Sequence, residues 1–180
     1  PLSHNRIRHI YEDKEQQLWI ATDGSINRYD YATRQFIHYN IVDNTGTYNT
    51  NWTYYIFEDT AGQLWISTCL GGIFVVDKHK LMQSTSGQYI AEQNYSVHNG
   101  LSGMFINQII PDNEGNVWVL LYNNKGIDKI NPRTREVTKL FADELTGEKS
   151  PNYLLCDEDG LLWVGFHGGV MRINPKDESQ

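Results

Sequence analysis

The chain has 180 residues, of which 39% are hydrophobic and 21% charged, and its mean hydropathy is −0.53. Its 15 lysines and arginines against 22 aspartates and glutamates give a formal net charge of −7, which argues against a general nucleic-acid-binding surface. The apolar runs are far shorter than a membrane-spanning helix, and the length suits one domain with a substantial core.

One short phrase recurs four times: Asp, two residues, a turn residue, one residue, Leu or Val, and then Trp. The four copies are Asp13–Trp19, Asp59–Trp65, Asp112–Trp118 and Asp157–Trp163. Their tryptophans stand 46, 53 and 45 residues apart. A recurring period in that range indicates a repeat architecture.

In chain order, each repeat predicts short strands of β-branched and aromatic residues joined by tight turns. Innermost strands are expected near residues 6–12, 52–58, 105–111 and 152–156, each followed by the Asp-x-x-Gly turn and a strand that holds the repeat Trp. Third strands are expected at 26–29, 73–76, 127–130 and 170–173, and fourth strands at 35–39 and 136–140. The turn assignment rests on Asp, which can bond backbone donors two residues on, and on Gly, which adopts positive φ freely.

This pattern predicts an all-β fold of β-propeller blades, since a small sheet cannot bury both faces alone and radial stacking can. Helical repeats are not expected, because Gly, Asn and Asp interrupt every apolar run. The blade repeats are assigned approximately to residues 5–47, 48–100, 101–145 and 146–180, so that residues 1–180 form a partial β-propeller. The repeat tryptophans are expected to pack between blades as core residues.

The fuller phrases at residues 7–30 and 58–68 closely resemble the two-component regulator propeller repeat, and the resemblance extends over nearly the whole chain. That repeat is found in the extracytoplasmic sensor region of hybrid histidine kinases, especially of Bacteroides-type gut bacteria. Three positions depart from the pattern: Gln16 replaces the turn Gly, and Leu121 and Phe166 replace the Thr that follows the Trp phrase.

The resemblance implies a seven-bladed propeller of which these four repeats would be part, and a periplasmic location. It also implies a parent chain with a membrane helix and a histidine kinase, a homodimeric parent, and sensing of polysaccharide breakdown products. The chain begins at Pro1 and stops after a third strand, so we interpret it as an excerpt. Two blade faces are then expected to be exposed and to pack against another copy or against further blades.

Strand alternation sorts the loops onto two faces. The Asp-x-x-Gly turns form a hairpin face, and the turns between second and third strands, with the connections between blades, form a loop face. Function usually resides in variable loops on a rigid scaffold. Thirteen residues before each repeat Trp stand Arg6, Trp52, Phe105 and Ser150, which do not repeat in type. The turns of the loop face add further candidates: Thr22, Asp23, Cys69, Leu70, Tyr122, Asn123, Asn124 and His167.

Aromatic rings mixed with Asn and Asp suit carbohydrate, because sugars offer apolar C–H faces and hydroxyls. The predicted ligand-binding residues are Arg6, Asp23, Trp52, Phe105, Tyr122, Asn123, Asn124 and His167. The alternative is that these residues are loop filler or pack against other blades.

Other chemistry is not indicated by the sequence. Asp157–Gly160 resembles the start of a calcium loop but lacks the closing Glu, and the six histidines show no pair at metal spacing. The segment 165–169 resembles an oxyanion loop, but no nucleophile elbow accompanies it. Cys69 and Cys156 are expected to be free, small buried thiols. No cofactor or metal is expected.

Three functions follow from these observations. The first is a sensor module that binds an oligosaccharide and signals to a kinase. The second is a propeller scaffold without a small ligand, used for protein–protein interaction or dimerisation. The third is an enzyme, which is the least favoured because the recurring acids lie on the hairpin face, away from the loops that would hold paired catalytic carboxylates. No nucleic acid partner is expected.

Overall fold

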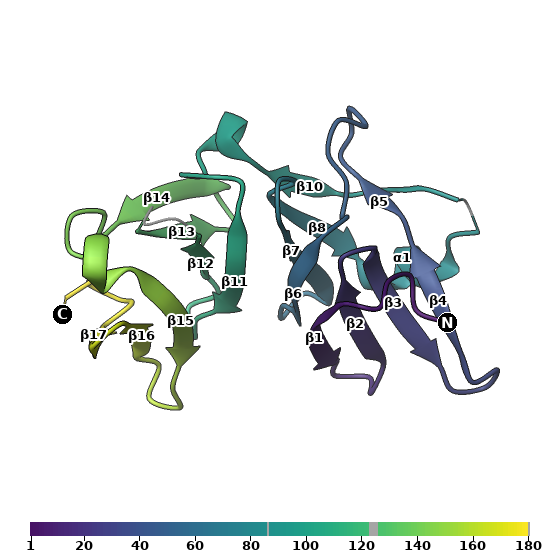
Figure 1. Cartoon of the computed structure of the whole chain (residues 1–180), viewed down its shortest axis with the longest axis horizontal. Helices are drawn as coiled ribbons and strands as arrows, with labels where there is room; N and C mark the ends of the chain where they lie inside the picture. The colour runs from purple at the N-terminus through teal and green to yellow at the C-terminus, as the bar shows by residue number, and fades with distance from the viewer. Residues whose placement is uncertain (86, 123–125, 180) are drawn as a thin grey trace. The chain divides into compact units, whose positions relative to one another are not determined.

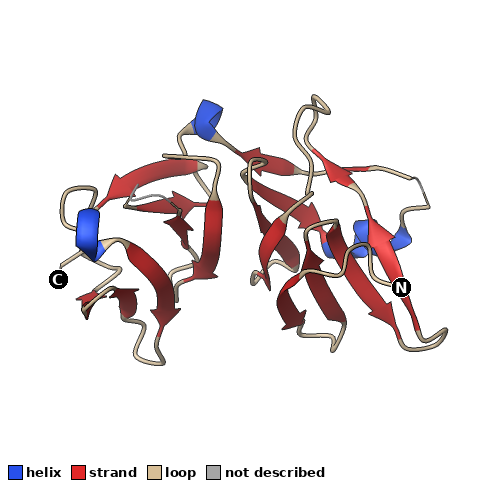
Figure 2. Cartoon of the chain, viewed as in Figure 1, coloured by secondary structure: helices blue, strands red, loops and turns tan. Residues whose placement is uncertain are grey.

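The computed structural model describes residues 1–85, 87–122 and 126–179, and these residues form four antiparallel sheets with little helix (Figures 1 and 2). Blade 1 holds β1 (Ile7–Glu12), β2 (Leu18–Thr22), β3 (Ser25–Asp30) and β4 (Gln35–Tyr39) in that order. Blade 2 holds β6 (Thr53–Glu58), β7 (Gln63–Thr68), β8 (Ile73–Asp77) and β10 (Gln93–Tyr95). Blade 3 holds β11 (Ile106–Pro111), β12 (Val117–Leu121), β13 (Ile127–Asn131) and β14 (Glu136–Leu140). Blade 4 holds β15 (Pro151–Cys156), β16 (Leu162–Phe166) and β17 (Gly169–Ile173).

Five smaller elements lie between the strands of these sheets. A parallel pair is formed by β5 (Ile41–Val42) and β9 (Tyr89–Ile90), and the helical turns are α1 (Lys78–Gln83), η1 (Val97–Asn99) and η2 (Gly147–Lys149). The prediction of an all-β chain of propeller blades is confirmed, and each of the four antiparallel sheets lies within one expected repeat range, whereas the β5–β9 pair joins two of them. The helix α1 was not expected. It follows β8 directly, and together with β9 it accounts for the longer step between Trp65 and Trp118.

The chain divides into two compact units, Pro1–Tyr95 with blades 1 and 2 and Ser96–Gln180 with blades 3 and 4. Within each unit the innermost strands of the two blades are neighbours, β1 beside β6 and β11 beside β15. In the first unit the seam carries side chains from both blades: the His9 ring stacks on Tyr55 at 3.8 Å between centroids, and His9 Nδ1 accepts from Ile56 N at 3.2 Å. In the second unit the Gln108 amide bonds Leu154 N and O at 2.8 and 2.9 Å.

The recurring phrase folds as one local unit in every blade. In blade 2, Asp59 Oδ1 accepts from the backbone N of Ala61 and Gln63, both at 2.9 Å, and Oδ2 accepts from Trp65 Nε1 at 2.9 Å. The same Trp-to-Asp bond is 2.8 Å in blade 1, 2.9 Å in blade 3 and 2.6 Å in blade 4. The aspartate therefore shapes the turn and also satisfies the indole N–H that burial would otherwise leave unpaired.

The turn residue that precedes the Trp strand adopts positive φ in all four blades. Gly62, Gly115 and Gly160 do so with φ of 78°, 84° and 82°. In blade 1 Gln16 takes the same conformation with φ of 62°, so the missing glycine leaves the turn geometry in place at the expense of backbone strain.

The expectation of core tryptophans is correct for three copies and wrong for the fourth. Trp19, Trp65 and Trp118 are at most 1% exposed, whereas Trp163 is only half-buried. The expectation of buried thiols is also wrong: Cys69 and Cys156 are free, as expected, but each is half-buried. Cys69 lies at the loop face, where the strands of blade 2 no longer cover it.

Candidate functional site

The loop face is built by a β-bulge that recurs at one position of the repeat. In every blade the pairing between the innermost and second strands shifts register at the second residue of the innermost strand, at Arg8, Tyr54, Asn107 and Asn152. A bulge re-aims the side chains of the strand that carries it, and bulges are frequent beside functional sites. No residue type in the sequence marks this bulge, so Arg8 and Tyr54 are not among the predicted site residues.

A backbone hydrogen bond closes the loop face of three blades in the same way. Asp23 N donates to Arg6 O at 3.3 Å, Cys69 N to Trp52 O at 2.9 Å, and Tyr122 N to Phe105 O at 2.9 Å. The bond joins the residue 13 positions before the repeat Trp to the residue four positions after it. Two sets of candidates found separately in the sequence are thus adjacent within each of these three blades.

In the first unit the structure brings Arg6, Asp23 and Trp52 together. Trp52 N donates to Asp23 O at 3.1 Å, which links blade 2 to blade 1. The Asp23 carboxylate accepts from Arg8 Nε at 2.7 Å and lies 3.3 Å from Arg6 Nη1. The hydrogen bond from Arg8 holds the pKa of Asp23 below its usual value, against a smaller opposing effect of burial.

The charges of this cluster are largely matched to one another. The Asp23 side chain is only 8% exposed, and the Arg8 guanidinium also lies over the Tyr54 ring at 4.5 Å. Arg6 keeps 65% of its side chain exposed. The cluster therefore offers one accessible cation and an internally paired Arg–Asp couple.

In the second unit the candidates are more dispersed. Phe105 is 40% exposed and Tyr122 is 63% exposed, and the two are joined only by their backbone bond. His167 is exposed in the turn between β16 and β17. Asn123 and Asn124 lie outside the residues that the structure describes.

A depression of about 330 Å³ opens beside Trp52 at the loop face of the first unit. The connection between blades 1 and 2 forms one side of it and the turn between β7 and β8 forms the other. Its lining residues are Thr47, Tyr48, Asn49, Asn51, Trp52, Cys69, Leu70 and Gly71.

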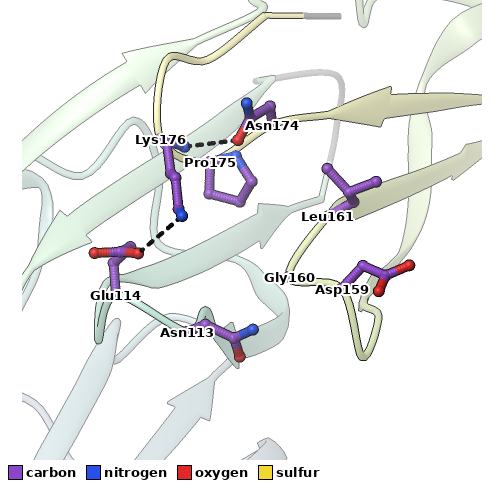
Figure 3. Close-up of a pocket in the computed structure, with 8 residues that line it drawn as sticks. All are labelled: Asn113, Glu114, Asp159, Gly160, Leu161, Asn174, Pro175 and Lys176. Carbon is purple, nitrogen blue, oxygen red and sulfur yellow. Dashed lines mark hydrogen bonds and ion pairs between the residues drawn. The ribbon is translucent and has the colours of Figure 1, made fainter.

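A second pocket of about 290 Å³ lies on the hairpin face of the second unit (Figure 3). The turn at Asn113–Glu114 and the turn at Asp159–Leu161 face the segment Asn174–Lys176, which follows β17. Lys176 N donates to Asn174 Oδ1 at 3.2 Å, and Lys176 Nζ lies 3.9 Å from Glu114 Oε1 across the pocket.

The first unit shows why this second pocket exists. At the matching position after β8, Lys78 inserts its ammonium between blades: Nζ lies 2.9 Å from Glu58 Oε1 and 3.2 Å from Asp13 Oδ2, with the lysine side chain fully buried. In the second unit Pro175 stands where Lys78 would be, and Cys156 stands where Glu58 would be. The pocket in Figure 3 therefore lies at the position where the first unit has the buried ion pairs of Lys78, which we call the Lys78 clamp. The ligand site is not assigned to this pocket.

Burial disfavours the charged forms of Lys78 and Asp13, but the hydrogen bonds to these groups favour the charged forms more strongly. The bonds from Lys78 to Glu58 and Asp13 raise the pKa of the ammonium, and bonds from Trp19, Gln17 N and Lys78 lower the pKa of Asp13. Across the described residues there is no group of three His, Cys, Asp or Glu side chains arranged to hold a metal ion.

The sequence and the structure of the chain resemble those of known propeller proteins. The sequence model of the two component regulator propeller matches residues 1–24 and 100–123, which hold the innermost and second strands of blades 1 and 3. These two segments match the two component regulator propeller repeat. No curated protein sequence matches the chain.

Solved structures agree with this assignment. The extracellular domain of the "putative one component system BT4673" from B. thetaiotaomicron is 98% identical over 100% of this chain, with a TM-score of 0.95. That of the "putative hybrid two component system BT3049" from the same organism is 21% identical over 96% of this chain, with a TM-score of 0.73. Virginiamycin B lyase from Staphylococcus aureus shares the fold, with 15% identity over 98% of this chain and a TM-score of 0.70.

The chain covers only 24% of the BT4673 domain, 22% of the BT3049 domain and 55% of the lyase. It aligns with a segment of the extracellular domain of a B. thetaiotaomicron protein that is described as a putative one component system. In the part of the chain that the structure describes, no helix is long and apolar enough to cross a membrane.

Proposed function

We propose that this chain is part of the sensor region of a signalling protein and that its loop face binds an oligosaccharide derived from a polysaccharide. Binding would change the conformation or the dimerisation of the sensor, and a histidine kinase of the parent protein would receive the signal. The segment itself carries no enzymatic role in this proposal.

The observation that supports the proposal is a contrast within the repeat. The Asp–Trp unit of the hairpin face has the same geometry in all four blades, whereas the loop face presents Arg6, Trp52 and Phe105 at one equivalent position. Binding residues concentrate on variable loops held by a rigid scaffold. Exposed aromatic rings beside amide and hydroxyl groups suit a sugar, which has apolar ring faces and hydroxyls.

Further blades of the parent chain are part of the proposal. Ile10 is 60% exposed on β1, whereas Ile56 at the equivalent position of β6 is fully buried. Tyr153 and Leu155 on β15 are 57% and 52% exposed. Apolar residues on an uncovered sheet face favour docking of another blade. The same exposed faces favour the second candidate function, a scaffold for protein–protein contact or homodimerisation without a small ligand.

Isothermal titration of the chain with a panel of oligosaccharides tests the proposal. Saturable binding of at least one oligosaccharide is expected. Absence of binding across the panel, together with concentration-dependent self-association in light scattering, would instead favour the scaffold.

A further inference from the structure

We infer that the depression beside Trp52 is a subsite for a neutral sugar ring, with Trp52 as its stacking platform. This inference rests on the proposed function and narrows it, since it selects one place on the loop face and one class of ligand.

The lining is uncharged. The residues around the depression carry hydroxyl, amide, thiol and aromatic groups, and none is an acid or a base. Its volume of about 330 Å³ lies at the lower end of the range of small-ligand sites. Among the lining residues, Trp52 is 48% exposed and Leu70 is 51% exposed. A site of this composition can stack on one face of a sugar ring and bond its hydroxyls, but it holds no cation to pair with a carboxylate or a sulfate.

Two of the non-glycine residues with positive φ lie at this depression. Trp52 has φ of 56° and Leu70 has φ of 80°, a region that bulky residues rarely adopt. Arg6, Phe105 and Ser150, which occupy the Trp52 position in the other blades, do not have positive φ. Strained residues are maintained at ligand sites more often than elsewhere because the surrounding structure holds them.

A one-residue insertion produces the exposed Leu70. Three residues separate Thr22 from Ile26 in blade 1, whereas four separate the equivalent Thr68 from Ile73 in blade 2. The extra residue places Leu70 at the rim of the depression. Leu70 is half-exposed in a left-handed conformation and is not among the buried core residues, so its placement is explained better by contact with a ligand than by folding.

The support under the depression is rigid. Trp52 is held from both sides, by its N–H bond to Asp23 O at 3.1 Å and by its carbonyl, which accepts from Cys69 N at 2.9 Å. Gly71 N donates to Thr68 Oγ1 at 3.0 Å, and Asn94 Nδ2 donates to Gly71 O at 2.9 Å. A site that is already ordered loses less entropy on binding.

Gly71 also fixes the distance between the two sides of the depression. A Cβ at this position would lie 2.6 Å from Asn49 O and 2.7 Å from Thr68 Oγ1, so only glycine allows this approach. The Asn49 side chain in turn accepts from Asn51 N at 2.9 Å. The connection between blades 1 and 2 therefore lies in close contact with the turn between β7 and β8.

Arg8 and Asp23 of the neighbouring cluster are paired and Arg6 stays accessible, but none of the three lines the depression. Arg8 and Asp23 bond to each other at 2.7 Å, and Arg6 joins the same carboxylate, on the blade 1 side of Trp52. This arrangement leaves the recognition inside the depression to stacking and to neutral hydrogen bonds.

The test compares Trp52→Ala, Trp52→Phe and Trp52→Gly with a control, Tyr31→Ala, by isothermal titration against the same panel. Tyr31 is 58% exposed and follows β3, outside the depression. The panel contains neutral oligosaccharides and, separately, oligosaccharides that carry uronic acids or sulfates. Loss of a stacking residue at a binding hot spot is expected to weaken binding of a neutral oligosaccharide by roughly ten-fold to thirty-fold. Trp52→Phe should keep part of the affinity, and Tyr31→Ala should keep all of it.

Trp52→Gly separates binding from folding. Glycine adopts positive φ without strain, so this variant is expected to melt no lower than Trp52→Ala while binding equally weakly. Wild-type binding of a sugar that Trp52→Ala leaves unchanged would overturn the subsite and leave the proposed function standing. Binding of acidic oligosaccharides alone would overturn the neutral ligand class. Wild-type failure to bind any sugar in the panel would refute the proposed function and this inference together.

Discussion

Replacing Lys78 by methionine should strongly destabilise the first unit. The ammonium of Lys78 is fully buried between the carboxylates of Asp13 and Glu58, at 3.2 and 2.9 Å, and these side chains are 0% and 4% exposed. Methionine fills a similar volume but carries no charge. Two nearly buried carboxylates would then face each other without a counter-ion, which typically costs about 3–5 kcal/mol of the free energy of unfolding.

The pH dependence gives this prediction a second signature. Asp13 has a pKa below its ordinary value of 3.8, so its contribution is present above that pH and is lost as the pH falls through the lowered pKa. Lys78 has a pKa above 10.5, so its contribution is present below that pH and is lost as the pH rises through the raised pKa. The difference between wild type and Lys78→Met should therefore be largest between about pH 5 and pH 9 and shrink in acid.

Urea unfolding monitored by circular dichroism measures this loss. The matched control is Lys80→Met on the same helix, whose side chain is 67% exposed and whose ion pairs with Asp77 and Glu92 are 3.6 and 3.9 Å long. Exposed pairs of this kind contribute about 0.5 kcal/mol or less. Equal losses of unfolding free energy for the two variants would refute the stabilising role of the buried Lys78 ion pairs. A loss for Lys78→Met that does not depend on pH would refute it as well.

Three further predictions concern the core, the seam and the loop face. Trp65→Ala should lower the free energy of unfolding by about 3–5 kcal/mol because Trp65 is only 1% exposed. Trp52→Ala should lower it by about 1 kcal/mol or less because Trp52 is 48% exposed. Similar losses for the two variants in urea unfolding would contradict this contrast. Burial lowers the pKa of His9, whose Nδ1 accepts from Ile56 N, so stability should be full above pH 6.5 and fall as the pH drops through 6.5 toward the lowered pKa. Melting temperatures across that range should show the decline in the wild type and a flatter profile in His9→Phe; equal profiles would argue against the role of this histidine. Leu70→Gly should leave the melting temperature unchanged or raise it, because glycine relieves the strain at φ of 80°, and a clear decrease would show that Leu70 supports the fold.

The sequence alone determined the repeat and the class of fold. The phrase from Asp59 to Trp65 forms its turn, its two backbone bonds and its indole bond within seven residues, so the pattern of residue types is sufficient to predict it. The four innermost strands begin within one residue of their expected positions for the same reason. Local interactions of this kind depend little on the rest of the chain.

Only the tertiary structure decided how distant residues meet. The ion pair between Lys78 and Asp13 joins two blades. Arg8 bonds to Asp23 because of a β-bulge that cannot be recognised from residue types. Trp163 is half-buried, although the equivalent tryptophans of the other blades are buried. The tertiary structure also united Trp52 with the Leu70 turn around one depression, whereas the sequence could only place both on the same face. These outcomes depend on which blade faces which, and the periodicity that reveals a repeat is the same for every blade.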